Sequence, residues 1–222
     1  MSINLKGSDN VNFEPMPSGL FPARLYRVIH IGTIEVEWKG EKKLQDKVRL
    51  GFEFPTETKV FNEEKGEQPN ALSREFTLSI SEKGNLRPFL EGWQGKKMTD
   101  EEAINVDLEE WVGKTGMINV VHGEPTESGQ VYANITTISP LPKNLECPDA
   151  VNEPFVMNYN DKWDIDKFES LPEFIKSRMK GSSEYDMITR EKAKPSPTSE
   201  SNGKLTAEKA PSDEINLMDI PF

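Results

Sequence analysis

The chain has 222 residues, with 38 aspartates and glutamates against 27 lysines and arginines, and so carries a formal charge of −11. Hydrophobic residues make up 35% of it, and even with its 15 glycines the apolar share stays below the roughly 45–50% of a typical globular chain, so we expect part of it to lie outside a packed core. No apolar run is long enough for a membrane-spanning helix or a signal peptide, the single cysteine excludes a disulfide framework, and the acidic balance argues against a simple cationic binder of duplex DNA.

Five β-strands are expected in the first two thirds of the chain, where short apolar runs alternate with turn residues. They are residues 19–31, 47–54, 74–80, 116–122 and 130–138. The second strand has a regular period of two, which places its apolar residues on one face and its polar residues on the other. The apolar face holds Val48, Leu50, Phe52 and Phe54, and the polar face holds Lys47, Arg49 and Glu53. We expect Phe52, Phe54 and Phe76 in the core.

The period becomes helical between the third and fourth strands. Asn85 is placed to cap a short helix, and Thr99 with Glu102 has the spacing of a capping box. Trp93 and Trp111 are expected to anchor this insertion on the strands. Three strands, helical material and two further strands favour a mainly β protein, a five-stranded antiparallel barrel of the oligonucleotide/oligosaccharide-binding (OB) fold.

Changes in composition divide the chain into four parts. These are an N-terminal leader at 1–18, an OB-fold domain at 19–145, a helical extension at 146–190 and a tail at 191–222. The tail is rich in Pro, Ser, Glu and Lys, so we expect it to be disordered. In the extension, Ser170 is expected to cap a helix that starts near Leu171 and packs on the barrel, with a second partner surface as the alternative. Its apolar face would hold Phe174, Ile175 and Met179.

The sequence shows no catalytic motif such as a phosphate-binding loop or a nucleophile elbow. His30 and His122 are expected to be half-buried strand residues, and Cys147 an inert thiol because no basic residue adjoins it. Paired acids such as Glu109 and Glu110 have the chemistry to hold Mg²⁺, so a metal-dependent nuclease is a lesser alternative. We therefore expect no enzyme, no cofactor and no metal.

Basic residues gather between residues 39 and 49, where five cations face two acids. In an OB barrel this segment contributes the first loop and the second strand, which flank the ligand groove. A site for single-stranded nucleic acid combines cations that follow phosphates with rings that stack on bases. The candidate phosphate contacts are Arg24, Lys39, Lys42, Lys43, Lys47, Arg49 and Arg74, and the candidate stacking rings are Tyr26, Trp38 and Tyr132. The alternative is that the rings cover the barrel and the lysines form a solvated hairpin tip.

The segment Asp219, Ile220, Pro221 and Phe222 offers an acid, a stiff proline and an aromatic ring, a compact ligand for a protein pocket. It resembles the C-terminal tip of bacterial single-stranded DNA-binding proteins. The preceding chain resembles bacteriophage-encoded single-stranded DNA-binding proteins of the OB fold. The segments that carry this second resemblance are 22–25, 47–55, 74–79, 85–96, 171–180 and 183–185.

These resemblances imply a protein of phage DNA replication, recombination and repair, located in the cytoplasm of a bacterial host. It would coat single-stranded DNA without sequence preference and recruit partner enzymes through residues 219–222. The sequence shows no evident oligomerisation element, so a monomer and a dimer both stay open. An OB-fold adaptor that binds proteins rather than nucleic acid is the alternative function.

Overall fold

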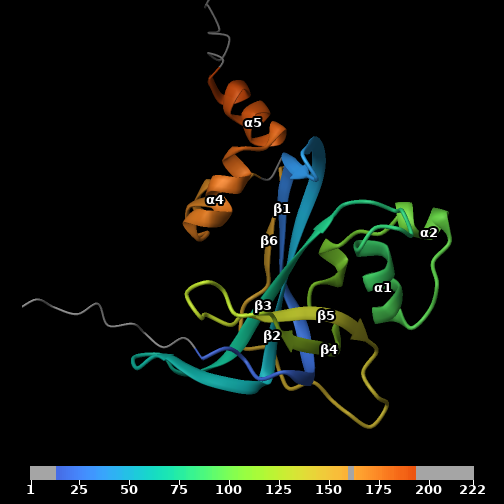
Figure 1. The fold of residues 1–222 in the computed structure, drawn as a ribbon, viewed down its shortest axis with the longest axis vertical. Helices are drawn as coiled ribbons and strands as arrows, with labels where there is room; N and C mark the ends of the chain where they lie inside the picture. Colours follow the sequence, from blue (N-terminus) through green and yellow to red (C-terminus); the bar gives the residue numbers. More distant parts are fainter. Residues whose placement is uncertain (1–13, 160–162, 194–222) are drawn as a thin grey trace, which may run out of the picture.

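The computed structural model describes residues 14–159 and 163–193 (Figure 1). Six strands form one sheet in the order β3–β2–β1–β4–β5, and the sixth strand joins β1. Their bounds are β1 Gly19–Trp38, β2 Glu41–Asn62, β3 Gly66–Thr77, β4 Thr115–His122, β5 Ala133–Ser139 and β6 Phe155–Met157. The expectation of a mainly β protein is confirmed. No helix among the described residues is long and apolar enough to cross a membrane.

Two features of the expected five-stranded barrel are corrected. The sheet has a sixth strand, because the short β6 pairs in parallel with β1 where β4 has ended. The sheet is also not closed, since no hydrogen-bonded ladder joins β3 to β5 in the described structure. Instead the Arg74 guanidinium on β3 donates to the backbone carbonyls of Ile135 and Thr136 on β5. A side chain thus takes the place of the missing ladder.

The β1–β2 hairpin is longer than its apolar pattern indicated. The two strands stay paired up to Trp38 and Glu41, around a two-residue turn at Lys39 and Gly40. Both turn residues have positive φ, 53° and 80°, as in the primed turns that match the twist of a hairpin. Charged side chains fill this end of both strands, and sequence alternation gives no signal there.

The first core lies between the inner face of the sheet and the helical insertion. The insertion comprises α1 Leu86–Gln94, α2 Asp100–Ile104 and a single 3₁₀ turn at Glu109–Trp111. Phe52, Phe54 and Phe76 are buried as expected, and the Trp93 and Trp111 rings meet at 5.1 Å between centroids. Of the two expected caps, the Thr99–Glu102 capping box is present, but the Asn85 side chain makes no capping hydrogen bond.

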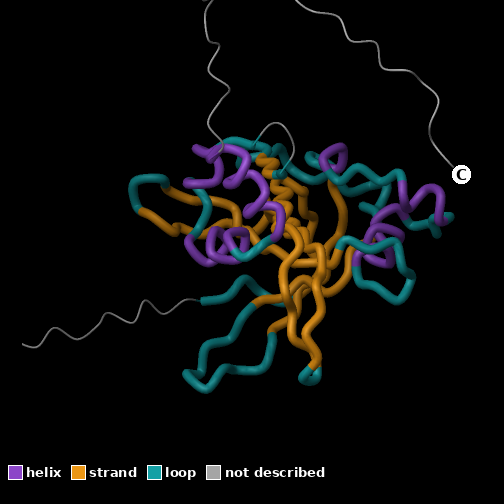
Figure 2. Tube along the Cα trace, turned by 90° about the horizontal axis from the view of Figure 1, so that it is seen from above, coloured by secondary structure: helices purple, strands orange, loops and turns teal. Residues whose placement is uncertain are grey.

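The second core lies between the outer face of β1 and the C-terminal extension. The extension comprises β6, α3 Ile165–Glu169, α4 Glu173–Lys180 and α5 Ser183–Ala193. Figure 2 shows the helices in two groups with the strands between them. The second core consists of Ile29, Ile31, Ile34, Met157, Phe168, Leu171, Ile175 and Met179. The extension therefore packs on the sheet.

Two details of the expected helix near Leu171 are wrong. Ser170 ends α3 rather than capping the next helix, because its hydroxyl donates to the Lys167 carbonyl and Pro172 occupies the N-cap of α4. Phe174 does not share the buried face of Ile175, since its side chain is 56% exposed. The orientation of α4 is set by the sheet on which it docks, which helical periodicity alone does not reveal.

A buried ion pair stabilises the helical insertion and makes its stability depend on pH. Glu91 accepts hydrogen bonds from Lys97 Nζ at 2.7 Å, the Met98 N–H at 3.1 Å and Arg87 Nε at 3.2 Å. These partners, Lys97 first, lower the pKa of Glu91 to about 2 from 4.5. The carboxylate therefore stabilises the fold above pH ~4.5, and this contribution is lost as the pH falls through about 2.

We therefore expect Glu91→Gln to lower Tm at pH 7. The deficit relative to wild type should shrink between pH 4.5 and pH 2, where the wild-type carboxylate itself becomes protonated. Thermal denaturation followed by circular dichroism across this range measures both effects. Glu101→Gln, an exposed change on α2, is the matched control. A Tm deficit that does not depend on pH would contradict the ionic role.

Candidate nucleic-acid interface

The outer face of β2 and its two neighbours carries charged side chains beside very small ones. Across the three strands, Arg27 lies opposite Gly51, which in turn lies opposite Ser73. A Cβ atom on Gly51 would stand 3.0 Å from the Arg27 Cβ, so the missing side chain leaves room for Arg27 to lie over β2. Two residues along β2, Arg49 lies opposite Glu75.

Four cations gather on this face, and we call them the cationic cluster. They come from β1, β2 and α4: Arg27, Lys47, Arg49 and Arg178. Partial burial is the main cause that lowers the pKa of both Lys47 and Arg49. The charge of Glu75 acts in the opposite direction on both pKa values. The charge of Arg178 lowers both pKa values further, and the charge of Arg27 also lowers the pKa of Arg49. The side chains are therefore close enough to repel one another. An anion bound here would relieve that repulsion.

Glu75 supplies the negative charge that faces the cationic cluster on the same sheet surface. Its Oε1 lies 2.7 Å from Arg178 Nη2, which links β3 to α4. Its charge also raises the pKa of both Lys47 and Arg49. One carboxylate therefore offsets part of a fourfold positive charge, and the balance of the cluster stays positive.

Three aromatic rings lie among these cations. The Arg27 guanidinium carbon is 5.2 Å from the Tyr26 ring centroid and 5.1 Å from that of Phe155. The Arg49 guanidinium carbon is 5.3 Å from the ring centroid of Phe174, which is largely exposed. Cations over ring faces form cation–π contacts and are held in place without using their hydrogen-bond donors. The face thus combines positive charge with apolar ring surface.

The structure brings three of the ten candidate residues together on this face: Tyr26, Lys47 and Arg49. Burial, more than any neighbouring charge, raises the pKa of Tyr26, so its phenol stays neutral. Lys47 donates to the Thr77 hydroxyl at 2.8 Å across the β2–β3 ladder. The alternation read from β2 placed Lys47 and Arg49 on this side, and the structure agrees.

Two arginines among the candidates have structural partners instead. Arg74 bonds to β5 and lies over the rings of Phe76 and Phe89 on the core side of the sheet. Arg24 donates to the Pro148 carbonyl, and its Nε lies 3.8 Å from the buried carboxylate of Glu53. These two guanidiniums tie parts of the chain together and do not join the cationic cluster.

The remaining candidates lie near the ends of two hairpins. Lys39, Lys42 and Lys43 stand at the β1–β2 turn, where Lys42 Nζ is 2.7 Å from Glu35 Oε1 and Lys43 Nζ is 2.8 Å from Glu41 Oε2. The hydrogen bond and charge of Glu35 raise the pKa of Lys42. Tyr132 is 53% exposed in the loop before β5. Trp38 belongs to β1 by its backbone, but its side chain lies outside what the structure describes.

The sequence reasoning missed four members of this face: Arg27, Arg178, Phe155 and Phe174. Arg27 was missed because the pairing of β1 with β2 shifts register between Leu25 and Arg27, which interrupts the alternation. The other three belong to the C-terminal extension. Their position depends on how the extension docks, and a local sequence pattern carries no signal for it.

The isolated histidine and cysteine side chains also have identifiable neighbours. His122 Nε2 lies 2.9 Å from the Met16 carbonyl oxygen, but the residue is exposed at the end of β4, so the expectation of a half-buried histidine is wrong at this position. Cys147, which has no basic neighbour in sequence, lies beside Arg24 in space. Burial still dominates and raises the pKa of the thiol, which keeps it protonated at neutral pH.

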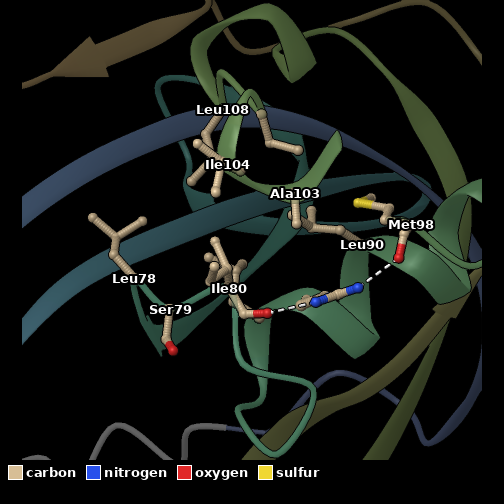
Figure 3. A pocket seen from close by; sticks show the side chains of 11 residues that line it. Leu78, Ser79, Ile80, Leu90, Met98, Ala103, Ile104 and Leu108 are labelled. Atoms are coloured by element: carbon tan, nitrogen blue, oxygen red, sulfur yellow. Dashed lines mark hydrogen bonds between the residues drawn. The ribbon is translucent and has the colours of Figure 1, made fainter. Parts of the chain in front are cut away.

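A separate pocket of about 230 Å³ lies between the end of β3 and the helical insertion (Figure 3). Its walls are mainly apolar: Leu78, Ile80, Leu86, Leu90, Met98, Ala103, Ile104, Val106 and Leu108. The Arg87 side chain at its edge donates to the backbone carbonyls of Ile80 and Met98 and is paired with Glu91 and Asp100. Because these two carboxylates already offset the charge of Arg87, the pocket presents less positive charge to a phosphate than the outer face does.

Comparison with known proteins gives no independent assignment. No protein-family model matches the chain, and no curated protein matches its sequence. The functional argument therefore rests on the sequence and on the geometry of the outer face.

Proposed function

We propose that this chain binds single-stranded DNA without sequence preference through the outer face of β1, β2 and β3. The observation that carries the proposal is the cationic cluster of Arg27, Lys47, Arg49 and Arg178 with aromatic rings among its members. The rings are those of Tyr26, Phe155 and Phe174. The likeness of the sequence to phage single-stranded DNA-binding proteins supports the same function, in replication, recombination and repair.

Two physical terms would supply the affinity. Cations that neutralise phosphates release condensed counterions, so four contacts would give a slope of up to about 2.8 in log affinity against log salt, at roughly 0.7 per phosphate. Each base stacked on a ring adds roughly 1–3 kcal/mol. A duplex keeps its base faces stacked inside the helix and offers them to no ring. The ring contacts would therefore favour single strands over duplex.

We propose in addition that residues 219–222 recruit replication and recombination enzymes. This part of the proposal rests on the sequence Asp219-Ile-Pro-Phe222 and its resemblance to bacterial tips, because the segment lies outside the described residues. A variant with Ile220, Pro221 and Phe222 replaced by alanine should keep its affinity for DNA and lose binding to a purified partner enzyme. Equal partner binding by the variant and the wild type would overturn this role.

The decisive experiment is fluorescence anisotropy of a labelled oligo(dT) of ~30 nucleotides. This length offers several bases to each ring and several phosphates to each cation. The full chain is titrated at two salt concentrations, with unlabelled duplex as the competitor. We expect tight binding that weakens steeply with salt and that the duplex does not displace. Absence of binding at micromolar protein in low salt would overturn the proposal and favour the OB-fold adaptor.

Glu75 gives a prediction in the opposite direction from the cations. Glu75→Gln removes the carboxylate that pairs with Arg178 and partly offsets the charges of Lys47 and Arg49. We expect oligo(dT) affinity to rise by roughly two- to fivefold at low salt, the worth of one partly exposed charge pair. Anisotropy titration measures it, with Glu67→Gln on the same strand as the control. Weaker binding by Glu75→Gln would show that its link to α4 matters more than its charge.

A further inference from the structure

Three side chains with metal-binding atoms meet where α5 crosses the β1–β2 hairpin. They are His30 on β1, Asp46 on β2 and Glu184 at the start of α5. His30 Nε2 lies 2.7 Å from Asp46 Oδ1, and one ligand atom from each of the three lies within 4.8 Å of the other two. All three are partly buried. The arrangement joins elements that are distant in sequence, and none of its members is used by the proposed DNA interface.

The Glu184 carboxylate is held in position before any ligand arrives. Its Oε2 accepts from the Thr33 N–H at 2.6 Å, and its Oε1 accepts from the Thr33 hydroxyl at 2.7 Å. The backbone leaves room for it at Gly32, which has a φ of +89° and where a Cβ atom would stand 2.7 Å from Oε2. Burial alone would raise the pKa of Glu184, but the hydrogen bonds from Thr33 and the nearby His30 outweigh it and lower the pKa. The carboxylate is thus kept ionised, and its orientation is fixed by the hydrogen bonds from Thr33.

We propose that His30, Asp46 and Glu184 bind a divalent transition-metal ion, for which zinc is the best fit. An imidazole nitrogen and two carboxylate oxygens are ligands that zinc accepts at about 2.0–2.2 Å, with water completing the tetrahedron. The imidazole distinguishes this site from an exposed acidic pair and disfavours Mg²⁺ and Ca²⁺, which prefer oxygen ligands. Binding requires the His30–Asp46 hydrogen bond to open and the three ligand atoms to converge on the ion.

A bound ion would cross-link the β1–β2 hairpin to the C-terminal extension. Glu184 already links α5 to β1 through its hydrogen bonds with Thr33. An ion coordinated also by His30 and Asp46 would add a second link at the same point. Binding to the folded state alone raises the free energy of unfolding, so the metal should raise Tm. The inference stands independently of the proposed function, because metal binding is measured without DNA.

The test is isothermal titration of Zn²⁺ into the full chain at pH 7 after treatment with a chelator. We expect one ion per chain, and at least tenfold weaker binding by His30→Gln and by Glu184→Gln. The matched control is His122→Gln, which removes the other histidine, whose Nε2 is engaged with the Met16 carbonyl. Co²⁺ in place of Zn²⁺ should give visible d–d absorption bands that depend on His30 and not on His122.

Asp46→Asn keeps the test decisive should a more buried change prevent folding, because the Asp46 side chain is 39% exposed, against 26% for His30. It should fold as wild type, bind Zn²⁺ at least tenfold more weakly and lose the metal-dependent rise in Tm. No zinc binding by the wild type at 100 µM ion, or equal binding by His30→Gln, would overturn the metal site. The His30–Asp46 hydrogen bond and the two Glu184–Thr33 hydrogen bonds would then be structural contacts only.

Discussion

Replacing Arg49 and Arg178 together by alanine is expected to weaken oligo(dT) binding by roughly 30-fold or more. The two guanidiniums come from different elements, β2 and α4, and interact closely enough for Arg178 to lower the pKa of Arg49. A hydrogen bond to a charged group contributes about 1.5–3 kcal/mol, so the loss of two phosphate contacts removes at least about 2 kcal/mol after solvent competition. The slope of log affinity against log salt should also fall by about 1.4, at roughly 0.7 per phosphate.

Two comparisons make this result specific to the outer face. The double variant Lys83→Ala/Lys96→Ala removes the same charge from the turns that flank α1, the helix that packs on the inner face of the sheet, and should leave affinity within about twofold. Thermal denaturation checks that the Arg49 and Arg178 changes leave the fold intact, since Arg49 also lies over the Phe174 ring. Equal losses in both double variants would indicate attraction by overall charge, and no loss in either would remove the outer face as the interface.

The sequence predicted those parts of the fold that depend on local pattern. The alternation along β2 placed Phe52 and Phe54 in the core because one face of the strand is buried and the other is polar. The capping box at Thr99 was found because both of its partners lie within four residues. The order of strands and helical insertion followed from such local signals, and with them the mainly β class.

The remaining features depend on contacts between distant segments. The hairpin end was missed because charged pairs across its strands, such as Glu35 with Lys42, resemble a solvated loop in sequence. The proposed interface was predicted only at Tyr26 on β1 and at Lys47 and Arg49 on β2. Its other half comes from α4 and β6, which dock on the sheet from more than one hundred residues away along the chain. A one-dimensional pattern has no access to that docking.

Glu53 shows most clearly that a local sequence pattern does not predict contacts between distant segments. The alternation of β2 assigned it to the polar face, yet its side chain is 0% exposed. The segment before β6 covers it: Glu53 Oε2 accepts from the Asn152 N–H at 2.8 Å, from Asn152 Nδ2 at 2.9 Å and from the Val151 N–H at 3.3 Å. Its Oε1 lies 3.8 Å from Arg24 Nε, and Arg24 in turn donates to the Pro148 carbonyl. One carboxylate thus anchors the segment that leads to β6.

Glu53→Ala is therefore expected to lower the free energy of unfolding by about 3–5 kcal/mol, the usual cost of breaking a buried ion pair. It leaves Arg24 without its counter-ion and removes the acceptor for three donors of Val151 and Asn152. Urea denaturation measures the loss, with Glu63→Ala in the exposed β2–β3 turn as the control, expected within about 0.5 kcal/mol of wild type. The segment that Glu53 anchors leads directly into β6, where the Phe155 ring lies beside Arg27. The folded variant should therefore also bind oligo(dT) more weakly. Wild-type stability in Glu53→Ala would show that the segment before β6 is held by its apolar contacts and that the charge pair adds little.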